Sequence, residues 1–407
     1  MTADLPRPLR ALSDKRRARS VRNALLRWYD GAKRDLPWRK TRDPYAIWIS
    51  ETMLQQTRVD TVIPYYERFL ARFPDVHTLA TADQDDVFGE WAGLGYYSRA
   101  RNLQAAARAI VDLHGGDLPE DVEGLRSLPG IGRYTAGALA SIAFDRCEAL
   151  VDGNVARVLT RLLGIRDDVK SPAIQARLWD EAGLLVVGER PGDLNQALME
   201  LGATVCTPRS PSCDACPWKR RCDARRVGDA ESLPVKPAKK QPRSMIAAAA
   251  WLRRPDSLEP LRSAPSTQST ESAESTGSAL SVSSGPRGGR ILAVRRPPGG
   301  LMGGLWELPG GECQRGEKPV DALQRSLRTT LGLELDRIDL VGSITHAFSH
   351  RSLRLHVFCC ETRGRVQRHS AGYFDAHGWL TPAQLALRPH GAPTRKALAL
   401  ALLEGSR

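Results

Sequence analysis

The chain has 407 residues, with 59 Lys and Arg against 46 Asp and Glu, so its formal net charge is +13 and its isoelectric point lies near 9.6. Apolar residues at 42% and charged residues at 26% describe a globular protein and exclude a mostly disordered one. The charge indicates a polyanionic partner, with nucleic acid ahead of an anionic membrane surface. Because no apolar run approaches the roughly 20 residues of a transmembrane helix and no secretory signal is present, we expect a cytoplasmic, nucleoid-associated protein with no membrane partner.

Positive charge is concentrated in two segments. Residues 1–42 carry 13 basic and 4 acidic side chains, and residues 207–243 carry 10 and 4. Two basic segments beside a near-neutral body fit a DNA-binding surface, because contacts to phosphates dominate affinity for nucleic acid. For residues 1–21 alone, a solvated basic tail is the simpler interpretation.

Residues 22–225 are predicted to form a helical domain. Apolar residues recur at helical spacing after Pro64, which we expect in the first turn of its helix, and again through residues 195–205. No convincing alternation of apolar and polar residues appears before residue 240, so this part should contain no sheet.

A glycine-containing turn lies between two of the predicted helices, at residues 128–136 (LPGIGRYTA). Gly130 and Gly132 allow a tight turn, and a helix beginning near Tyr134 would direct free N–H groups out of the loop. Such a hairpin binds phosphate without reading sequence, although an ordinary helical hairpin is the alternative. With Asp152 in the following VDGNV, the pattern resembles the helix-hairpin-helix DNA glycosylase superfamily, which implies two helical subdomains with an active site between them.

Glu51 stands among apolar residues in the sequence WISETMLQQT. A carboxyl group in such surroundings would have its neutral form favoured and could act as an acid near pH 7. A glutamate on the surface of a helix is the alternative from the residue alone. The segment resembles the motif of MutY-type adenine glycosylases, whose catalytic glutamate occupies this position.

This resemblance implies a division of labour between two carboxylates. Glu51 would protonate adenine at N7, and Asp152, as an anion, would stabilise the cationic sugar. Tyr134 and Asn154 match residues that hydrogen-bond around this pair. Relatives of the endonuclease III type carry a lysine in place of Tyr134, whose amine forms a Schiff base, so the tyrosine implies a glycosylase without strand-cleaving activity.

The resemblance also implies residues that contact DNA. Gln56 and Tyr96 match residues that wedge into the base stack, and Trp38 and Arg39 match a segment of the adenine pocket, although Trp38 and Tyr96 could equally be core aromatics. The implied substrate is double-stranded DNA in which adenine, paired with 8-oxoguanine or guanine, is flipped out of the duplex. We expect a monomer, and the sequence indicates no downstream repair partner.

Four of the eight cysteines lie within 17 residues, at Cys206, Cys213, Cys216 and Cys222. Their clustering favours a metal site in a reducing compartment over disulfides. Zinc is the alternative, although four-cysteine zinc sites are usually built from two C-x2-C pairs, and only one is present. The spacing resembles the loop of the same superfamily, which implies a [4Fe–4S] cluster.

A second domain is predicted at residues 245–402, after a Pro- and Lys-rich linker at 226–244. The pattern changes there from helical spacing to strand-like segments, so the chain as a whole is multidomain, with an all-α glycosylase domain first and, as the resemblance given below implies, an α+β domain second. Residues 255–289 contain 10 Ser, 3 Thr and no aromatic residue, and we expect a disordered insertion there. Strands are predicted at 245–252, 290–295 and 353–359.

The second domain resembles a Nudix fold that has lost its hydrolytic residues. Four positions of the Nudix box keep their residue, namely Gly311, Glu317, Arg325 and Gly332. Its three glutamates, which normally hold Mg²⁺, are replaced by Ser326, Thr329 and Thr330. We therefore expect a domain that keeps the fold without the chemistry.

A nonhydrolytic Nudix domain beside an adenine glycosylase is the arrangement of MutY-type enzymes, and implies recognition of 8-oxoguanine by the short loop Phe348, Ser349 and His350. A loop at a strand end is the alternative interpretation. Three rival functions remain to be distinguished. They are an endonuclease III-like pyrimidine glycosylase/lyase, a nonenzymatic Fe–S DNA-binding protein, and an oxidised-nucleotide pyrophosphatase.

Overall fold

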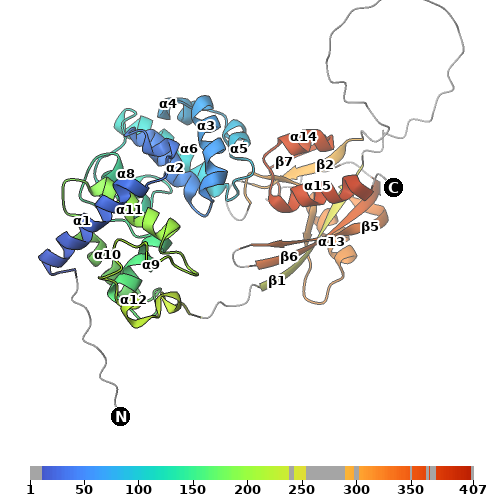
Figure 1. The fold of residues 1–407 in the computed structure, drawn as a ribbon. Helices are drawn as coiled ribbons and strands as arrows, with labels where there is room; N and C mark the ends of the chain where they lie inside the picture. The colour runs from blue at the N-terminus through green and yellow to red at the C-terminus, as the bar shows by residue number, and fades with distance from the viewer. Residues whose placement is uncertain are drawn as a thin grey trace, which may run out of the picture. The chain divides into compact units, whose positions relative to one another are not determined.

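The computed structural model describes residues 12–237, 243–253, 289–297, 302–348, 351–363, 366 and 373–404. Its contacts divide the chain into two compact units (Figure 1). The first comprises residues 1–94 and 99–239, and the second comprises residues 95–98 and 240–407. Within the described residues, no helix is both long enough and apolar enough to cross a bilayer. Of the basic tail expected at residues 1–21, residues 1–11 lie outside this description, as does nearly all of the serine-rich segment. The expectation of a solvated tail is wrong for the rest, because the chain is helical from Lys15 and Leu12, Ala18 and Val21 are buried in the first unit.

The first unit is helical, as predicted, and its described residues contain no strand. Its helices are α1 (Lys15–Ala32), η1 (Pro37–Arg39), α2 (Pro44–Leu54), α3 (Val59–Arg72), α4 (Val76–Thr81), α5 (Gln84–Trp91), α6 (Ser98–His114), α7 (Val122–Ser127), α8 (Arg133–Ile142), α9 (Gly153–Leu163), α10 (Pro172–Val186), α11 (Pro191–Thr204), α12 (Asp223–Val227) and η2 (Ala230–Ser232).

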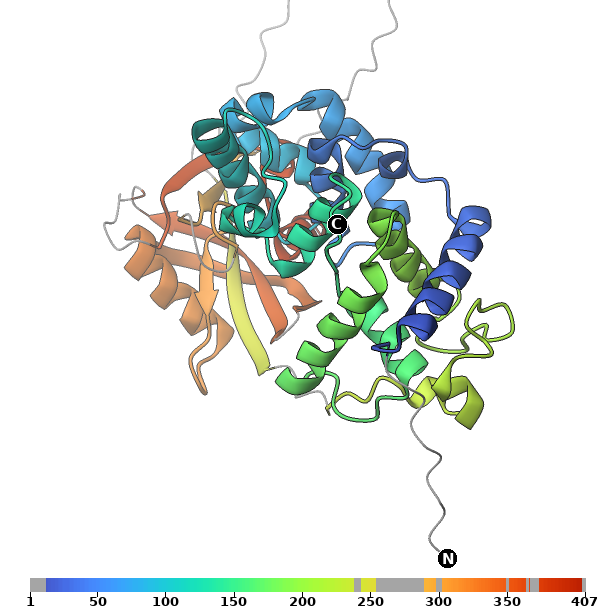
Figure 2. The same ribbon diagram turned by 90° about the vertical axis from the view of Figure 1, so that its left-hand side faces the viewer.

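These helices pack in two groups. In one, α2 lies against α3 and α8, and α7 precedes α8 in the hairpin. In the other, the N-terminal helix α1 returns to pack on α10 and α11, and α9 packs on α10, α11 and α12 (Figure 2). The contact between α8 and α11 joins the two groups, so residues at the start of α8 and along α11 face a common space.

Helix α2 crosses the interior of the first unit. Its start is fixed by Asp43, whose side chain accepts hydrogen bonds from the N–H groups of Tyr45 and Ala46, and by Pro44 in the first turn. Every residue from Tyr45 to Met53 is buried, including Glu51. A helix that is apolar on nearly all sides is stable only when enclosed, so the sequence itself places this glutamate inside the protein.

The expected position of Pro64 is wrong. Helix α3 begins at Val59, so Pro64 lies inside the helix rather than in its first turn. Proline has no N–H group to donate to the carbonyl four residues earlier, which belongs to Asp60. Asp60 is exposed, and water can satisfy that carbonyl, which explains why the helix tolerates the proline.

The second unit is α+β, as predicted. Strands β4, β1, β6 and β5 form one sheet in that order, in which β1 and β6 are parallel, and β3, β2 and β7 form a second sheet. Its elements are β1 (Arg243–Leu252), β2 (Ile291–Arg295), β3 (Trp306–Glu307), β4 (Gly310–Glu312), α13 (Pro319–Leu331), β5 (Glu334–Ala347), β6 (Arg351–Arg363), β7 (Ala376–Leu380), α14 (Pro382–Leu387) and α15 (Ala392–Glu404).

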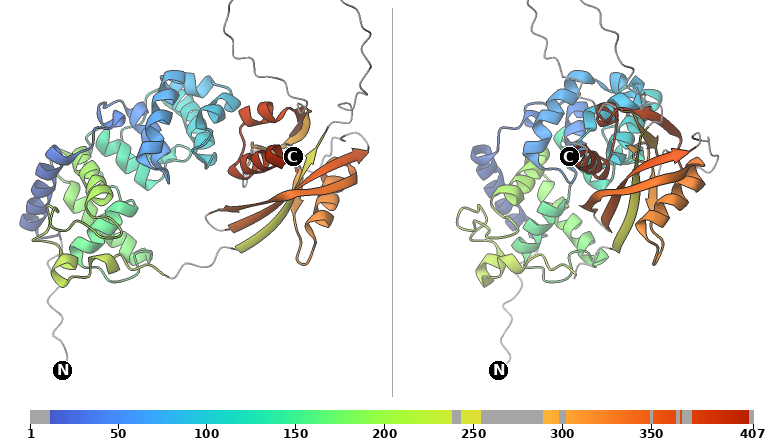
Figure 3. Two further views of the ribbon diagram at one scale, coloured as in Figure 1. Left: turned by 45° about the vertical axis from the view of Figure 1, so that its right-hand side comes forward. Right: turned by 90° about the vertical axis from the view of Figure 1, so that its right-hand side faces the viewer.

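Alternate residues of β1 supply the two cores of this unit. Ala249 and Trp251 pack in one apolar cluster with residues of α15, whereas Ala248, Ala250 and Leu252 pack in another with residues of α13. Side chains alternate between the two faces of a strand, so α13 and α15 cover opposite faces of the sheet (Figures 1 and 3). A continuous apolar strand is what a sheet covered on both faces requires.

Candidate active site

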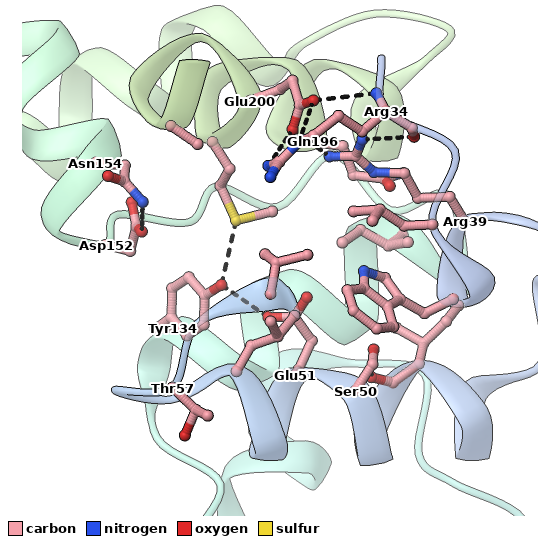
Figure 4. A pocket seen from close by; sticks show the side chains of 18 residues that line it. Arg34, Arg39, Ser50, Glu51, Thr57, Tyr134, Asp152, Asn154, Gln196 and Glu200 are labelled. Atoms are coloured by element: carbon pink, nitrogen blue, oxygen red, sulfur yellow. Dashed lines mark hydrogen bonds and ion pairs between the residues drawn. The ribbon is translucent and has the colours of Figure 1, made fainter. Parts of the chain in front are cut away.

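A cavity of about 180 Å³ lies between the two groups of helices in the first unit (Figure 4). Its walls come from η1, α2, the start of α8, the turn before α9, and α11. The polar residues that line it are Arg34, Arg39, Ser50, Glu51, Thr57, Tyr134, Asp152, Asn154, Gln196 and Glu200. Residues up to 169 positions apart in the sequence, Arg34 and Ala203, therefore contribute to one space.

Glu51 is the buried carboxyl group of this cavity. It is 5% exposed, and its Oε2 accepts a hydrogen bond of 2.7 Å from the hydroxyl of Tyr134. Burial raises the pKa of Glu51 to about 7, with the negative charge of Asp152 acting in the same direction and the Tyr134 hydrogen bond and Arg39 opposing it. Glu51 can therefore hold a proton at neutral pH and give it up, as a general acid requires.

Tyr134 connects Glu51 to the opposite wall of the cavity. Its hydroxyl also lies 3.2 Å from the sulfur of Met199 on α11 (Figure 4). Burial, together with the nearby Glu51 and Asp152 carboxyls, raises the pKa of the Tyr134 phenol well above its ordinary value. The phenol therefore stays neutral and serves as a hydrogen-bond donor.

Asp152 occupies the N-cap of α9. Its Oδ1 accepts a hydrogen bond of 2.7 Å from the N–H of Val155, and its Oδ2 accepts one of 3.0 Å from the side-chain amide of Asn154. Burial raises the pKa of the Asp152 carboxyl, while these hydrogen bonds and Arg157 act in the opposite direction. Two donors and a helix N-terminus thus hold this carboxylate in a fixed orientation.

Arg157 fixes the orientation of the Asn154 side chain. Its guanidinium donates to the side-chain oxygen of Asn154 at 2.9 Å, to the carbonyl of Gly202 at 2.7 Å and to the carbonyl of Cys206 at 2.8 Å. Gly202 permits this packing, because a Cβ there would lie 2.7 Å from the Cβ of Asn154. The turn carrying Asp152 is thereby joined to the start of the cysteine-rich loop.

An ion pair between buried Glu200 and two arginines forms another wall of the cavity. Both Arg34 and Arg39 contact the Glu200 carboxylate at 2.8 Å, and the Glu200 side chain is fully buried. Burial alone would raise the pKa of Glu200, but the hydrogen bonds from the two arginines lower it to about 2. Trp38, also in this wall, is 7% exposed and packs edge-on against Tyr66. Trp38 is thus both a core aromatic and a lining residue.

The predicted wedge residues lie on two exposed loops. Gln56 is exposed and has φ +60°, and Tyr96 is 49% exposed with φ +49°. Both backbones are in the left-handed region that non-glycine residues rarely adopt. In the hairpin, Gly130 has φ +77°, and a Cβ there would meet Asn102 at 2.6 Å, whereas Gly132 is exposed with open space around it. The turn thus requires a glycine at Gly130, and the open space at Gly132 allows another molecule to approach the backbone closely.

The four clustered cysteines are free thiols in the loop between α11 and α12. Burial raises the pKa of Cys216 to about 12, with Cys206, Cys222 and Cys213 acting in the same direction and the N–H of Trp218 opposing them. These influences show that the four thiols lie near one another in the loop. Across the described residues, no three His, Cys, Asp or Glu side chains form a group that could hold a single metal ion.

In the second unit, two of the three residues that replace the box glutamates, Ser326 and Thr330, have packing roles, whereas Thr329 is exposed. Ser326 donates to the carbonyl of Gly310 at 2.8 Å, and Thr330 donates to the carbonyl of Ser326 at 2.8 Å. The retained Glu317 and Arg325 form an ion pair at 2.7 Å. Of the predicted lesion loop, Phe348 packs edge-on against His346 and on the core. Ser349 and His350 lie outside the described residues.

Sequence reasoning missed Arg34, Glu200, Arg157 and Met199. The sequence does indicate that Glu200 is buried. This residue lies three positions after Ala197 and one before Leu201, on the apolar side of its helix. A charge on a buried helix face usually has a partner. No local pattern identifies Arg34 as that partner, because the two residues are 166 positions apart.

Known proteins are similar to both units. Residues 49–182 match the HhH-GPD superfamily of base excision DNA repair proteins, and residues 285–400 match the NUDIX domain. The chain is 41% identical over 376 residues to the adenine DNA glycosylase of Mus musculus, covering 86% of this chain and 72% of that one. It is 41% identical over 371 residues to the adenine DNA glycosylase of Homo sapiens, covering 85% and 68% of the two chains.

Proposed function

This chain belongs to the adenine DNA glycosylase family, and we propose that it excises adenine paired with 8-oxoguanine or guanine in double-stranded DNA. The observation that carries the proposal is the buried Glu51 carboxyl, with a pKa of about 7, in one cavity with Asp152. Removing such an adenine initiates base excision repair and prevents G·C to T·A changes.

Glu51 supplies the proton in this scheme. Adenine is a poor leaving group unless protonated, and a neutral carboxyl donates a proton to N7 as the N-glycosidic bond breaks. Tyr134 holds the carboxyl in place and, being neutral, does not compete for the proton. Once it has lost its proton, Glu51 accepts one from the water that adds to the sugar, which restores the acid.

Asp152 stabilises the charge left on the sugar. Loss of adenine makes the sugar an oxocarbenium-like cation, and a fixed carboxylate beside it lowers the energy of that state. The hydrogen bonds from Val155 and Asn154 favour the charged form of the carboxylate and oppose the burial that raises its pKa. Because Tyr134 has no amine to form a Schiff base, hydrolysis of the glycosidic bond is the only covalent change.

The DNA duplex contacts three features of the helical part of the chain. The hairpin around Gly130 and Gly132 binds backbone phosphates through its free N–H groups. Gln56 and Tyr96 enter the base stack as adenine leaves it, and Trp38 and Arg39 border the pocket that receives the base. The protein acts as a monomer in the nucleoid.

The second unit recognises the base opposite adenine. Phe348, together with Ser349 and His350 outside the described residues, contacts 8-oxoguanine. Ser326 and Thr330 use their hydroxyls for packing, so this unit supplies recognition without pyrophosphate hydrolysis.

We propose that Cys206, Cys213, Cys216 and Cys222 hold a [4Fe–4S] cluster. Four thiolates without histidine are the donor set of such a cluster, and Cys206 lies near enough to the other three to raise the pKa of each. When bound, the cluster supplies a rigid cross-link within the loop. The chemistry at the glycosidic bond requires no electron transfer.

A single-turnover assay on four duplexes tests the function. They differ only at one pair, with adenine opposite 8-oxoguanine, guanine or thymine, or an oxidised pyrimidine opposite guanine. We expect alkali-labile sites at the two mispaired adenines alone, and their disappearance in Glu51→Gln. Strand cleavage at the oxidised pyrimidine without alkali would instead place the protein with the endonuclease III type.

A further inference from the structure

We propose that Arg99 is a positioning residue that holds Gln56 and Tyr96 ready to enter the base stack. It does so by fixing both of their loops with a single guanidinium. The inference rests on the proposed function, because the roles of Gln56 and Tyr96 in DNA belong to it.

Arg99 secures the first loop at the end of α2. The residue lies on α6 and is 8% exposed. Its Nη1 lies 2.9 Å from the carbonyl oxygen of Thr52, 2.8 Å from that of Met53 and 2.6 Å from that of Gln55. The last carbonyls of a helix lack partners within the helix and favour a nearby cation. Arg99 thus caps α2 directly before Gln56.

The same side chain secures the second loop. Its Nη2 donates to the carbonyl of Leu94 at 3.0 Å, two residues before Tyr96, and to the hydroxyl of Thr57 at 3.3 Å. The guanidinium also stacks over the ring of Trp91, at 5.3 Å from its centre. One nitrogen therefore bonds to both loops, which are about 40 residues apart in sequence.

Both loops need such support. Gln56 and Tyr96 have φ values of +60° and +49°, and non-glycine residues persist in this region only where their surroundings hold them there. An arginine presents several N–H donors in a rigid plane, whereas a lysine presents three on one nitrogen. Lysine at position 99 keeps the charge, but its single ammonium nitrogen cannot occupy both the position of Nη1 beside the end of α2 and that of Nη2 beside Leu94.

The test uses the full-length protein with the substitution Arg99→Lys and a matched control, Arg108→Lys. Arg108 is on the same helix and donates to one carbonyl, that of Ala80, at 3.0 Å. Excision is measured in single-turnover assays on the adenine–guanine duplex, and unstacking by the fluorescence of 2-aminopurine placed beside the adenine. For Arg99→Lys we expect excision about 10- to 100-fold slower and a reduced fluorescence rise, with Arg108→Lys close to wild type.

A double-mutant cycle separates positioning from a general structural role. In a protein carrying Gln56→Ala and Tyr96→Ala, the side chains through which Arg99 acts are absent, so Arg99→Lys should slow excision less than about twofold further. The pH profile of excision should keep its midpoint, because Glu51 is not the group that Arg99 positions.

Three results would overturn the proposal. They are an undiminished effect of Arg99→Lys in the double-alanine background, a shifted pH midpoint, and an Arg99→Lys protein that is unfolded at the assay temperature. A wild-type protein inactive on every adenine duplex would instead reject the proposed function. The fluorescence measurement, which needs binding and not excision, would then still decide whether Arg99 controls unstacking.

Discussion

The two units differ at the positions where their families carry functional carboxyl groups. In the first, the cavity keeps Glu51 and Asp152 buried, although burial raises the pKa of both carboxyls. In the second, Ser326 and Thr330 stand where a Nudix hydrolase has glutamates, and their hydroxyls bond to nearby carbonyls. The first unit keeps the two carboxyls that the proposed chemistry needs despite the cost of burying them, whereas at the box positions of the second unit packing alone is enough to keep the Nudix architecture.

The largest effect should follow from removing the acid. Glu51→Gln keeps the size of the side chain and its contact with Tyr134 but has no proton to donate to adenine. We expect excision to fall by about 10²- to 10⁴-fold in single-turnover assays, the range of general acid catalysis. Residual excision at the wild-type rate would show that another group protonates the base.

The same substitution should change stability in a direction that depends on pH. The folded pKa of Glu51, about 7, exceeds its ordinary 4.5. The stabilising contribution of its neutral form is therefore complete below pH 4.5 and lost as pH rises through 7. At pH 8, Glu51→Gln should increase the free energy of unfolding by up to about 3 kcal/mol, measured by urea denaturation. A destabilised variant at pH 8 would contradict burial of the charge.

Asp152→Asn tests the second carboxylate. Asparagine is as good an N-cap as aspartate, so the start of α9 and the melting temperature should change little. Loss of the negative charge beside the sugar should slow excision by about 10²- to 10³-fold. A large loss of stability with normal excision would assign Asp152 a purely structural role.

Breaking the ion pair of Glu200 should lower the free energy of unfolding. Glu200→Gln leaves Arg34 and Arg39 without their carboxylate, and we expect about 3 kcal/mol of destabilisation at pH 7. Because the folded pKa of Glu200 is about 2 and its ordinary value is 4.5, the pair stabilises above pH 4.5 and is lost as pH falls through 2. The difference between wild type and variant should therefore shrink in acid, which denaturation at several pH values would detect.

The smallest effect is expected in the second unit. Ser326→Ala removes one hydrogen bond to the Gly310 carbonyl and should cost about 1 kcal/mol of stability. Excision should be unchanged, since this hydroxyl has a packing role. A drop in excision without a drop in stability would show that the degenerate box still contributes to function.

The sequence predicts the architecture well where its signals are local. Helical spacing and apolar strands place the all-α and α+β parts correctly, and the apolar surroundings of Glu51 indicate its burial. Pro64 was misplaced because propensity favours proline in a first turn, whereas packing decides where α3 begins.

The rest of the site depends on contacts between distant segments. The ion pair of Arg34 with Glu200, the support of Asn154 by Arg157 and the two loops held by Arg99 each join residues whose own neighbours give no sign of the partner. Folding brings these segments together, and only the three-dimensional structure reveals the pairing.

The pH dependence of excision tests the central claim most directly, that buried Glu51 is the proton donor. Single-turnover rates on an adenine–guanine duplex should be high below pH 7 and fall about tenfold per unit well above it, as the Glu51 carboxyl loses its proton. The residual rate of Glu51→Gln should lack this decline. A wild-type rate that stays level or rises between pH 7 and 9 would contradict the account.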